Sequence, residues 1–253
     1  MMKRNIVLMI VAGALTSVLP AAELSLSAGG GALVGGLFTR YTLSADGNIS
    51  NNAVTVHADQ QMNQINYGGF LFIDATWAQF SVGLQGGNNT FRETMTADSS
   101  RQREMDEDIS GTSREMMLSF ALLGKYPISL NETLTLFPLA GIEYQIALAE
   151  YRNKNDGRGE YKRTSIREAD ANGIPYTLPV WNSFFVDIGG GIDAALPSSL
   201  YLRTELLYCF RLQTFYELDT LEKVKKGVHA PDPKLAGLTS GPALKISAGW
   251  RFF

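Results

Sequence analysis

Two-residue alternation of apolar and polar side chains runs through most of the chain and limits the folds that it can adopt. Between Leu200 and Leu212 the even positions are mostly apolar, whereas Arg203, Glu205 and Arg211 occupy odd positions. This period places successive side chains on opposite faces, as in a β-strand with one apolar and one polar face. Because comparable segments recur, the sequence predicts eight β-strands and almost no helix. The other seven segments are 33–43, 65–73, 80–84, 116–126, 134–148, 184–196 and 244–252.

The connections between these segments alternate between short and long. Consecutive connections of an up-and-down antiparallel barrel lie at opposite ends, so the short turns share one end and the long loops the other. This asymmetry is typical of bacterial outer-membrane barrels, whose periplasmic turns are short and extracellular loops long. The predicted fold class is therefore all-β, an eight-stranded antiparallel up-and-down transmembrane β-barrel. The short connections are 74–77, 127–132 and 197–199, and the long polar ones are 45–61, 92–113, 152–179 and 217–240.

A closed barrel also satisfies the backbone inside a membrane, where every donor and acceptor must be paired. Each spanning strand needs roughly 9 to 11 residues at a tilt of about 45°. The rival fold is a soluble eight-stranded barrel of lipocalin type, with its apolar face turned inward around a ligand. Alternation alone does not separate the two, but one-sided loop lengths and interfacial aromatic residues at strand ends favour the membrane form. These aromatic residues are Trp77, Tyr126, Trp181, Trp250 and Phe252.

The N-terminus has the layout of a secretory signal peptide. Lys3 and Arg4 precede an apolar stretch over 6–19, and small residues follow before Glu23. We expect residues 1–22 to be a cleaved signal peptide, residues 23–253 to be the barrel domain, and the cell outer membrane to be the destination. A net charge of −3 with both signs interspersed offers no basic face for nucleic acid. Cys209 is the single cysteine, so an internal disulfide is excluded.

If the apolar face of each strand points toward lipid, the charged residues at the alternate positions point into the lumen. Asp193 is expected opposite Arg203 across the hairpin that turns at Pro197, as an internal ion pair. Eight strands leave an interior only just wide enough for side chains, so paired charges would fill it as a polar plug. The alternative is a narrow solute path lined by the same charges. The predicted lumen residues are Asp74, Lys125, Glu143, Asp187, Asp193, Arg203, Glu205, Arg211, Lys245 and Arg251.

Two features depart from a regular ladder. The parity of the apolar residues changes across 29–31, from Leu26 to Leu33 and Leu37, which predicts a β-bulge in this glycine run. Pro138 lies inside a predicted strand although it lacks the backbone donor that a ladder requires. We expect it at a bulge or at a locally unpaired position.

The sequence offers no constellation for catalysis, a cofactor or a metal ion. His57 and His229 both lie in predicted external loops, in contexts that do not suggest a base beside a nucleophile. Two distant histidines and one thiol are too few ligands for a metal site. The chain is therefore predicted to be non-enzymatic, with no catalytic, cofactor-binding or metal residues.

The C-terminal strand carries a family resemblance. Family members end in alternating apolar residues with a terminal aromatic, and from about Glu23 to Phe253 the layout resembles the small outer-membrane β-barrel proteins of diderm bacteria. That group includes OmpX, OmpW and the OmpA transmembrane domain. The resemblance implies that the barrel-assembly machinery recognises this strand, although Phe253 is one residue beyond the pattern. The alternating residues are Leu244, Ile246, Ala248, Trp250 and Phe252.

The expected function follows from this layout and resemblance. We expect a monomer embedded in outer-membrane lipid, with a largely plugged polar lumen and surface loops that bind an extracellular ligand or a host surface. The alternative is an OmpW-like narrow channel or porin for small, hydrophobic solutes. A barrel enzyme that acts on lipid is the third hypothesis.

Overall fold

The computed structural model describes residues 25–49, 52–99, 102–154, 160–163, 183–212 and 234–252. The predicted signal peptide, Trp181, His229 and Phe253 lie outside the described residues. In the described part of the chain there is no helix long and apolar enough to cross a membrane. The strands are β1 (Leu26–Ile49), β2 (Asn52–Ala75), β3 (Ala78–Ser99), β4 (Gln102–Lys125), β5 (Ile128–Ser129), β6 (Leu134–Lys154), β7 (Glu160–Arg163), β8 (Ser183–Ala195), β9 (Leu200–Arg211) and β10 (Lys234–Arg251).

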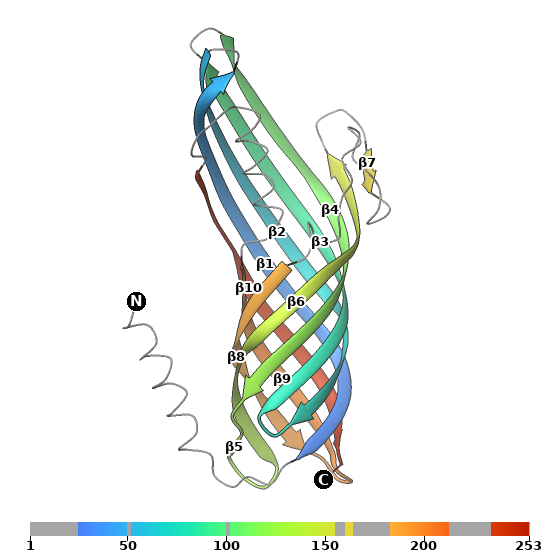
Figure 1. Ribbon diagram of the computed structural model, residues 1–253. Coiled ribbons are helices and arrows are strands. Elements are labelled where there is room, and N and C mark those ends of the chain that lie inside the picture. The colour runs from blue at the N-terminus through green and yellow to red at the C-terminus, as the bar shows by residue number, and fades with distance from the viewer. Residues whose placement is uncertain are drawn as a thin grey trace, which may run out of the picture.

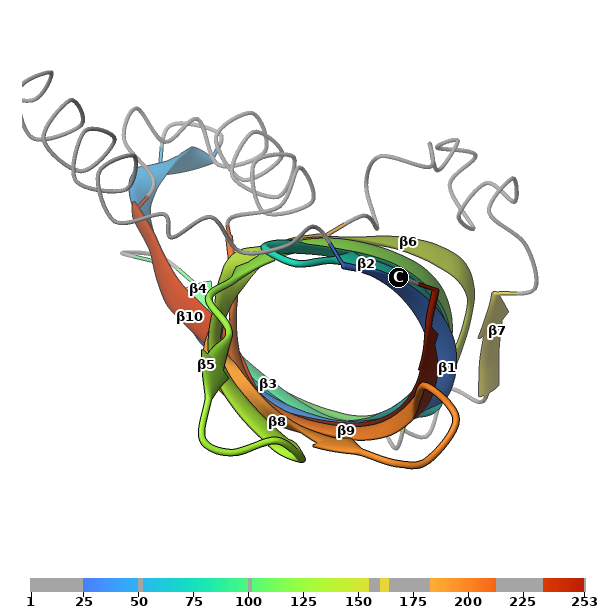
Figure 2. The same ribbon diagram turned by 90° about the horizontal axis from the view of Figure 1, so that it is seen from below.

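Eight of these strands close into a ring. Neighbours pair in the order β4, β3, β2, β1, β10, β9, β8, β6, and an additional β4–β6 ladder joins the two ends. All of these ladders are antiparallel, and β1 pairs with β10 from Ser27↔Arg251 to Ser44↔Lys234. The view along the axis shows the closed ring (Figure 2). The predicted eight-stranded up-and-down barrel is confirmed, with β5 and β7 as short additions that pair only with β6.

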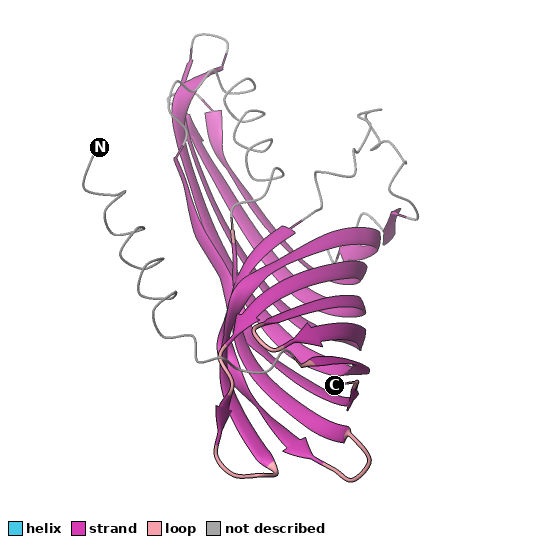
Figure 3. Ribbon diagram, turned by 60° about the horizontal axis from the view of Figure 1, so that its bottom comes forward, coloured by secondary structure: helices cyan, strands magenta, loops and turns pink. Residues whose placement is uncertain are grey.

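The short turns lie together at one end of the barrel, as expected (Figure 3). The β2–β3 turn is formed by Thr76 and Trp77. At the β8–β9 turn, Ser198 and Ser199 have φ values of 67° and 64°, the left-handed geometry that matches the twist of two antiparallel strands. The C-terminal end lies at this end too, where the Phe252 amide donates a 2.8 Å hydrogen bond to the carbonyl of Leu26.

At the opposite end, two of the four predicted long loops are strand, while most of 152–179 and 217–240 lies outside the described residues. The predicted loops 45–61 and 92–113 are paired strand over most of their length, because β1 continues to Ile49, β2 starts at Asn52, β3 runs to Ser99 and β4 starts at Gln102. Figure 1 shows these four strands rising together well beyond the ends of β8 and β9. We call these projecting parts of β1 to β4, residues 45–49, 52–61, 92–99 and 102–113, the hairpin sheet.

The β-bulge predicted at 29–31 is wrong. The register of β1 with β2 is unbroken from Leu26↔Ala75 to Ile49↔Asn52, so the odd positions of β1 face inward throughout. Leu33 and Leu37 are therefore buried lumen residues rather than members of the lipid face. The β4–β6 ladder does contain a bulge, since Met116 pairs with Ala149 and Met117 with Ala147.

Pro138 lies where one ladder of β6 has ended. On one side it pairs with Gly190 of β8. On the other side the β4 ladder stops at Lys125↔Leu139, and only the Pro138 carbonyl accepts a hydrogen bond, of 3.3 Å, from the Tyr126 amide. The missing donor of proline thus falls at a locally unpaired position, as predicted.

Candidate functional site: the lumen

Strand alternation places the charged side chains on the inner face of the barrel wall. Among the predicted lumen residues, Lys125 keeps only 8% of its side-chain area exposed, Arg211 is partly buried, and Arg251 at the short-turn mouth keeps 41%. The remaining seven are buried: Asp74, Glu143, Asp187, Asp193, Arg203, Glu205 and Lys245. The lumen of this barrel is thus the place where its ionisable groups meet.

The guanidinium of Arg203, on β9, links three other strands. Its Nε and Nη2 donate to the two carboxylate oxygens of Asp193 on β8, at 2.7 and 2.8 Å. Nη2 also donates to Asp74 Oδ2 on β2 at 2.5 Å, and Nη1 donates to Gln79 Oε1 on β3 at 2.7 Å. Such bidentate, charge-assisted bonds are among the stronger hydrogen bonds in proteins. Asp193 and Arg203 are also register partners, as the hairpin predicted.

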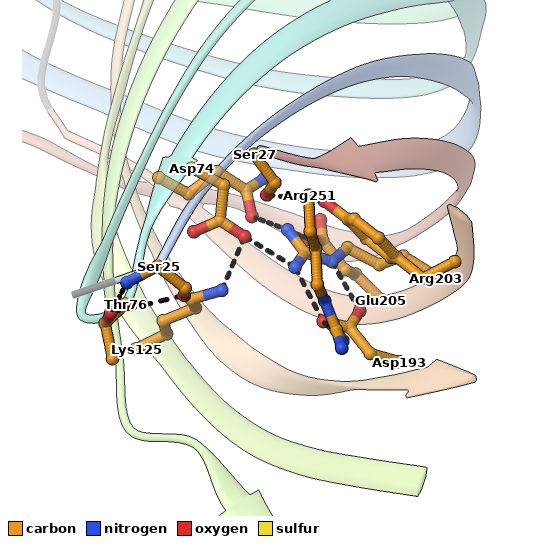
Figure 4. Close-up of polar contacts among 11 residues, drawn as sticks. Ser25, Ser27, Asp74, Thr76, Lys125, Asp193, Arg203, Glu205 and Arg251 are labelled. Carbon is orange, nitrogen blue, oxygen red and sulfur yellow. Dashed lines mark hydrogen bonds and ion pairs between the residues drawn. The ribbon is translucent and has the colours of Figure 1, made fainter. Parts of the chain in front are cut away.

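Lys125 extends this network to β4. Its Nζ donates to Asp74 Oδ2 at 2.5 Å, so that one carboxylate oxygen bridges two cations (Figure 4). Glu205 Oε1 lies 3.8 Å from Arg203 Nη1, and Arg251 Nη2 lies 4.0 Å from Asp193 Oδ2. We call Asp74, Gln79, Lys125, Asp193 and Arg203 the Arg203 layer.

Aromatic rings surround the charged centre of this layer. The Arg203 guanidinium carbon lies 5.2 Å from the ring centroid of Phe72, 5.0 Å from that of Phe137 and 5.1 Å from that of Tyr201. Cation–π attraction of this kind strengthens when the site is desolvated. Glycine leaves room for two of the rings, because a Cβ at Gly191 would meet Phe137 and one at Gly249 would meet Tyr201.

A second polar layer crosses the lumen farther from the short turns. Glu143 Oε1 accepts hydrogen bonds from Gln145 Nε2 at 2.6 Å and Gln85 Nε2 at 3.2 Å. Gln85 Nε2 also donates to Ser119 Oγ at 2.9 Å, and Lys245 Nζ lies 3.8 Å from Glu143 Oε2. We call these five residues the Glu143 layer. Its members come from β3, β4, β6 and β10, so it again ties strands across the barrel.

Polar contacts continue to the projecting end. Asn89 Nδ2 donates to Ser113 Oγ at 2.9 Å and to Glu115 Oε1 at 2.7 Å. Beyond them, Arg211 Nη2 donates to Tyr41 Oη at 2.9 Å, and Tyr41 Oη lies 3.1 Å from Thr239 Oγ1. The lumen therefore holds a succession of hydrogen-bonded layers rather than one constriction.

Two apolar clusters pack against these layers, and the sequence analysis did not predict them. The first consists of Leu33, Phe70, Phe72 and Tyr201, and the second of Leu123, Phe137, Leu139 and Leu207. Strand alternation could have revealed them, because Phe72 precedes Asp74 by two positions and Tyr201 precedes Arg203 by two. A residue two positions from a lumen charge faces the lumen as well.

The described interfacial candidates all lie at the short-turn end. Trp77 is partly buried within the β2–β3 turn, while Tyr126, Trp250 and Phe252 are 40%, 46% and 56% exposed. Their position at the level of lipid headgroups stays a prediction, based on the preference of amphipathic rings for that zone.

The described residues contain no group of three His, Cys, Asp or Glu side chains that could hold a metal ion. His57 is exposed on β2, where its Nε2 lies 3.6 Å from Asp59 Oδ2. Inside the barrel, several serine and threonine hydroxyls hydrogen-bond to other polar groups, as in the 2.9 Å pair of Ser27 and Tyr201. The polar side chains of the lumen thus cross-link the strands of the barrel wall through hydrogen bonds and ion pairs.

The exterior defines the class of the protein. Large apolar side chains cover the outside of the ring, and Leu71, Ile65 and Leu206 are 72%, 61% and 61% exposed. Water-soluble monomers rarely expose contiguous apolar patches larger than a few hundred Å². A closed ring with charges inside and an apolar band outside is a transmembrane β-barrel.

No family model and no curated protein matches the chain. Solved structures similar to it include Ail, the attachment invasion locus protein of Yersinia pestis, in complex with the heparin analogue sucrose octasulfate. Ail is 12% identical, and the match covers 90% of this chain and 99% of Ail with a TM-score of 0.28. The translocator domain of the autotransporter NalP from Neisseria meningitidis is 10% identical, with 98% and 96% covered and a TM-score of 0.26. A Pseudomonas aeruginosa FadL homologue is 7% identical, with 90% and 91% covered and a TM-score of 0.23. These neighbours are outer-membrane β-barrel proteins.

Proposed function

We propose that this protein is a non-enzymatic outer-membrane β-barrel whose lumen is closed to solutes and whose hairpin sheet presents a surface for partners outside the cell. The observation that carries the proposal is the Arg203 layer. One guanidinium bonds to Asp193, Asp74 and Gln79 from three different strands, and all four side chains are buried.

Closure follows from the width of the ring. Eight strands enclose a space that side chains can fill. Here Phe72, Phe137 and Tyr201 occupy the space around the guanidinium, and the Glu143 layer repeats the closure farther along the axis. A solute would have to break several buried, charge-assisted bonds at once to pass.

The hairpin sheet supports the second part of the proposal. Segments displayed on a rigid scaffold are where binding residues concentrate. The sheet is continuous with the barrel wall through β1 to β4, and residues 92–113 carry charges of both signs. It is therefore suited to recognise an extracellular ligand or a host surface. We further propose that the chain is a monomer, and that its C-terminal strand is read by the barrel-assembly machinery.

Planar-bilayer recording tests closure. We expect the refolded full chain to insert without reproducible openings, because the Arg203 layer blocks the lumen, while a porin recorded in parallel controls for membrane fusion. Reproducible openings that a bulky substitution at Glu143 or Asp187 abolishes would contradict closure and support the narrow channel instead.

A further inference from the structure

A cavity of about 30 Å³ lies inside the barrel at the level of the Glu143 layer. Apolar side chains such as Leu37 and Phe185 line one part, and Asn66, Gln85, Glu143 and Lys245 line another. The Arg203 layer lies between this cavity and the short-turn mouth, and the Asn89 and Glu115 contacts lie toward the projecting end. The cavity thus lies within the lumen, between these two sets of polar contacts.

Polar groups at this cavity need partners that the neighbouring side chains do not supply. Asn66 Oδ1 is buried and has no hydrogen-bond partner among the described residues. Asn66 itself is only 5% exposed, so bulk solvent does not reach it. Lys245 Nζ lies 3.8 Å from Glu143 Oε2, which is beyond hydrogen-bond distance, and an ammonium has three N–H groups to donate.

We propose that this cavity is a water-binding site, and that its water bridges Lys245 Nζ and Glu143 Oε2. A water needs roughly 10 to 15 Å³ of cavity volume and two to four polar partners, so about two molecules fit here. Such a water would hydrogen-bond to both members of an ion pair whose own separation is too long for a direct hydrogen bond. The proposal concerns the interior only and stands apart from the surface-binding role.

The second apolar cluster contains a phenylalanine that can be compared with the one lining the cavity. Phe137 lies among Leu123, Leu139 and Leu207 and is 1% exposed. Phe185, which lines the cavity, is 3% exposed. Phe185 lines the cavity and Phe137 does not. Two phenylalanines of nearly equal burial therefore differ in whether the proposed water adjoins their rings.

X-ray radiolytic footprinting of the full chain in lipid nanodiscs tests this difference. Hydroxyl radicals that form from bound water oxidise the side chains beside it. We expect Phe185 to be oxidised several-fold faster than Phe137, which serves as the matched internal control. Equal oxidation of the two rings would overturn the proposal.

Two filling variants, Asn66→Leu and Ala243→Ile, connect the signal to the cavity. Both place extra apolar volume at its wall, and Asn66→Leu also removes the unpaired acceptor. Variants that keep the heat-modifiable gel migration of a folded barrel should oxidise Phe185 no faster than Phe137. If either folded variant retains fast oxidation of Phe185, the water does not lie in this cavity and the proposal fails. Conductance plays no part in this test, so its outcome is distinct from that of the closure test.

Discussion

Replacing Arg203 with methionine is expected to lower the free energy of unfolding by about 3–5 kcal/mol, the range for breaking a buried ion pair by removing one partner. The substitution keeps much of the side-chain volume but leaves Asp193 and Asp74 without their shared donor. Two carboxylates would then lie in a lumen where their exposed areas are 5% and 2%. Urea titration of the barrel in lipid vesicles, followed by heat-modifiable gel migration, measures the loss.

Arg251→Met is the matched control, because Arg251 lies 4.0 Å from the same Asp193 carboxylate but keeps 41% of its side chain exposed. Exposed ion pairs contribute about 0–1 kcal/mol, so this variant should unfold near the wild-type urea concentration. A double variant, Arg203→Met with Asp193→Asn, should recover part of the loss by removing one orphaned charge. Equal, small effects of the two arginine substitutions would contradict the role given to the Arg203 layer.

Replacing Leu71 with arginine is expected to destabilise the barrel by about 2–4 kcal/mol, the cost of an arginine on the lipid face near the bilayer midplane. Leu71 is 72% exposed on the outer face of β2, amid the apolar band. Lipid surrounds this position, so the guanidinium loses its hydration. The same urea titration in vesicles reports the change.

Ser129→Arg provides the comparison for this substitution. Ser129 is exposed on β5 near the short turns, where water can solvate a new charge. We expect little change in its unfolding midpoint. If Leu71→Arg were as well tolerated as Ser129→Arg, the apolar band would not be facing lipid.

The eight strands could be predicted because each carries a two-residue period, and that period also fixed the lumen face of Arg203 and Asp193. The register of the β8–β9 hairpin places Arg203 opposite Asp193, and this pairing could be predicted without knowing the rest of the ring. Leu33 and Leu37 were misassigned because the glycines between them and Leu26 have no side chain to reveal parity. The continuous β1–β2 register resolves that ambiguity.

The partners of Arg203 across the barrel lay beyond sequence reasoning. Asp74 and Gln79 are 129 and 124 residues away in the chain, and only ring closure brings them to the guanidinium. Uncharged members of the layers, such as Gln85 and Asn89, gave no electrostatic signal. Residues 45–61 and 92–113 were predicted as loops because they are rich in polar and charged side chains, whereas the β1–β2 and β3–β4 ladders continue through them.

The orientation of the wall can be measured directly with a nitroxide at Leu206, introduced as Leu206→Cys in a Cys209→Ser background and reconstituted in lipid. Leu206 is 61% exposed on the outer face of β9. We predict that this label collides more often with oxygen, which concentrates in lipid, than with a water-soluble nickel chelate. A reference label at Ser129 should show the reverse. Nickel collisions at position 206 as frequent as those at position 129 would contradict a membrane-embedded barrel with its apolar face outside.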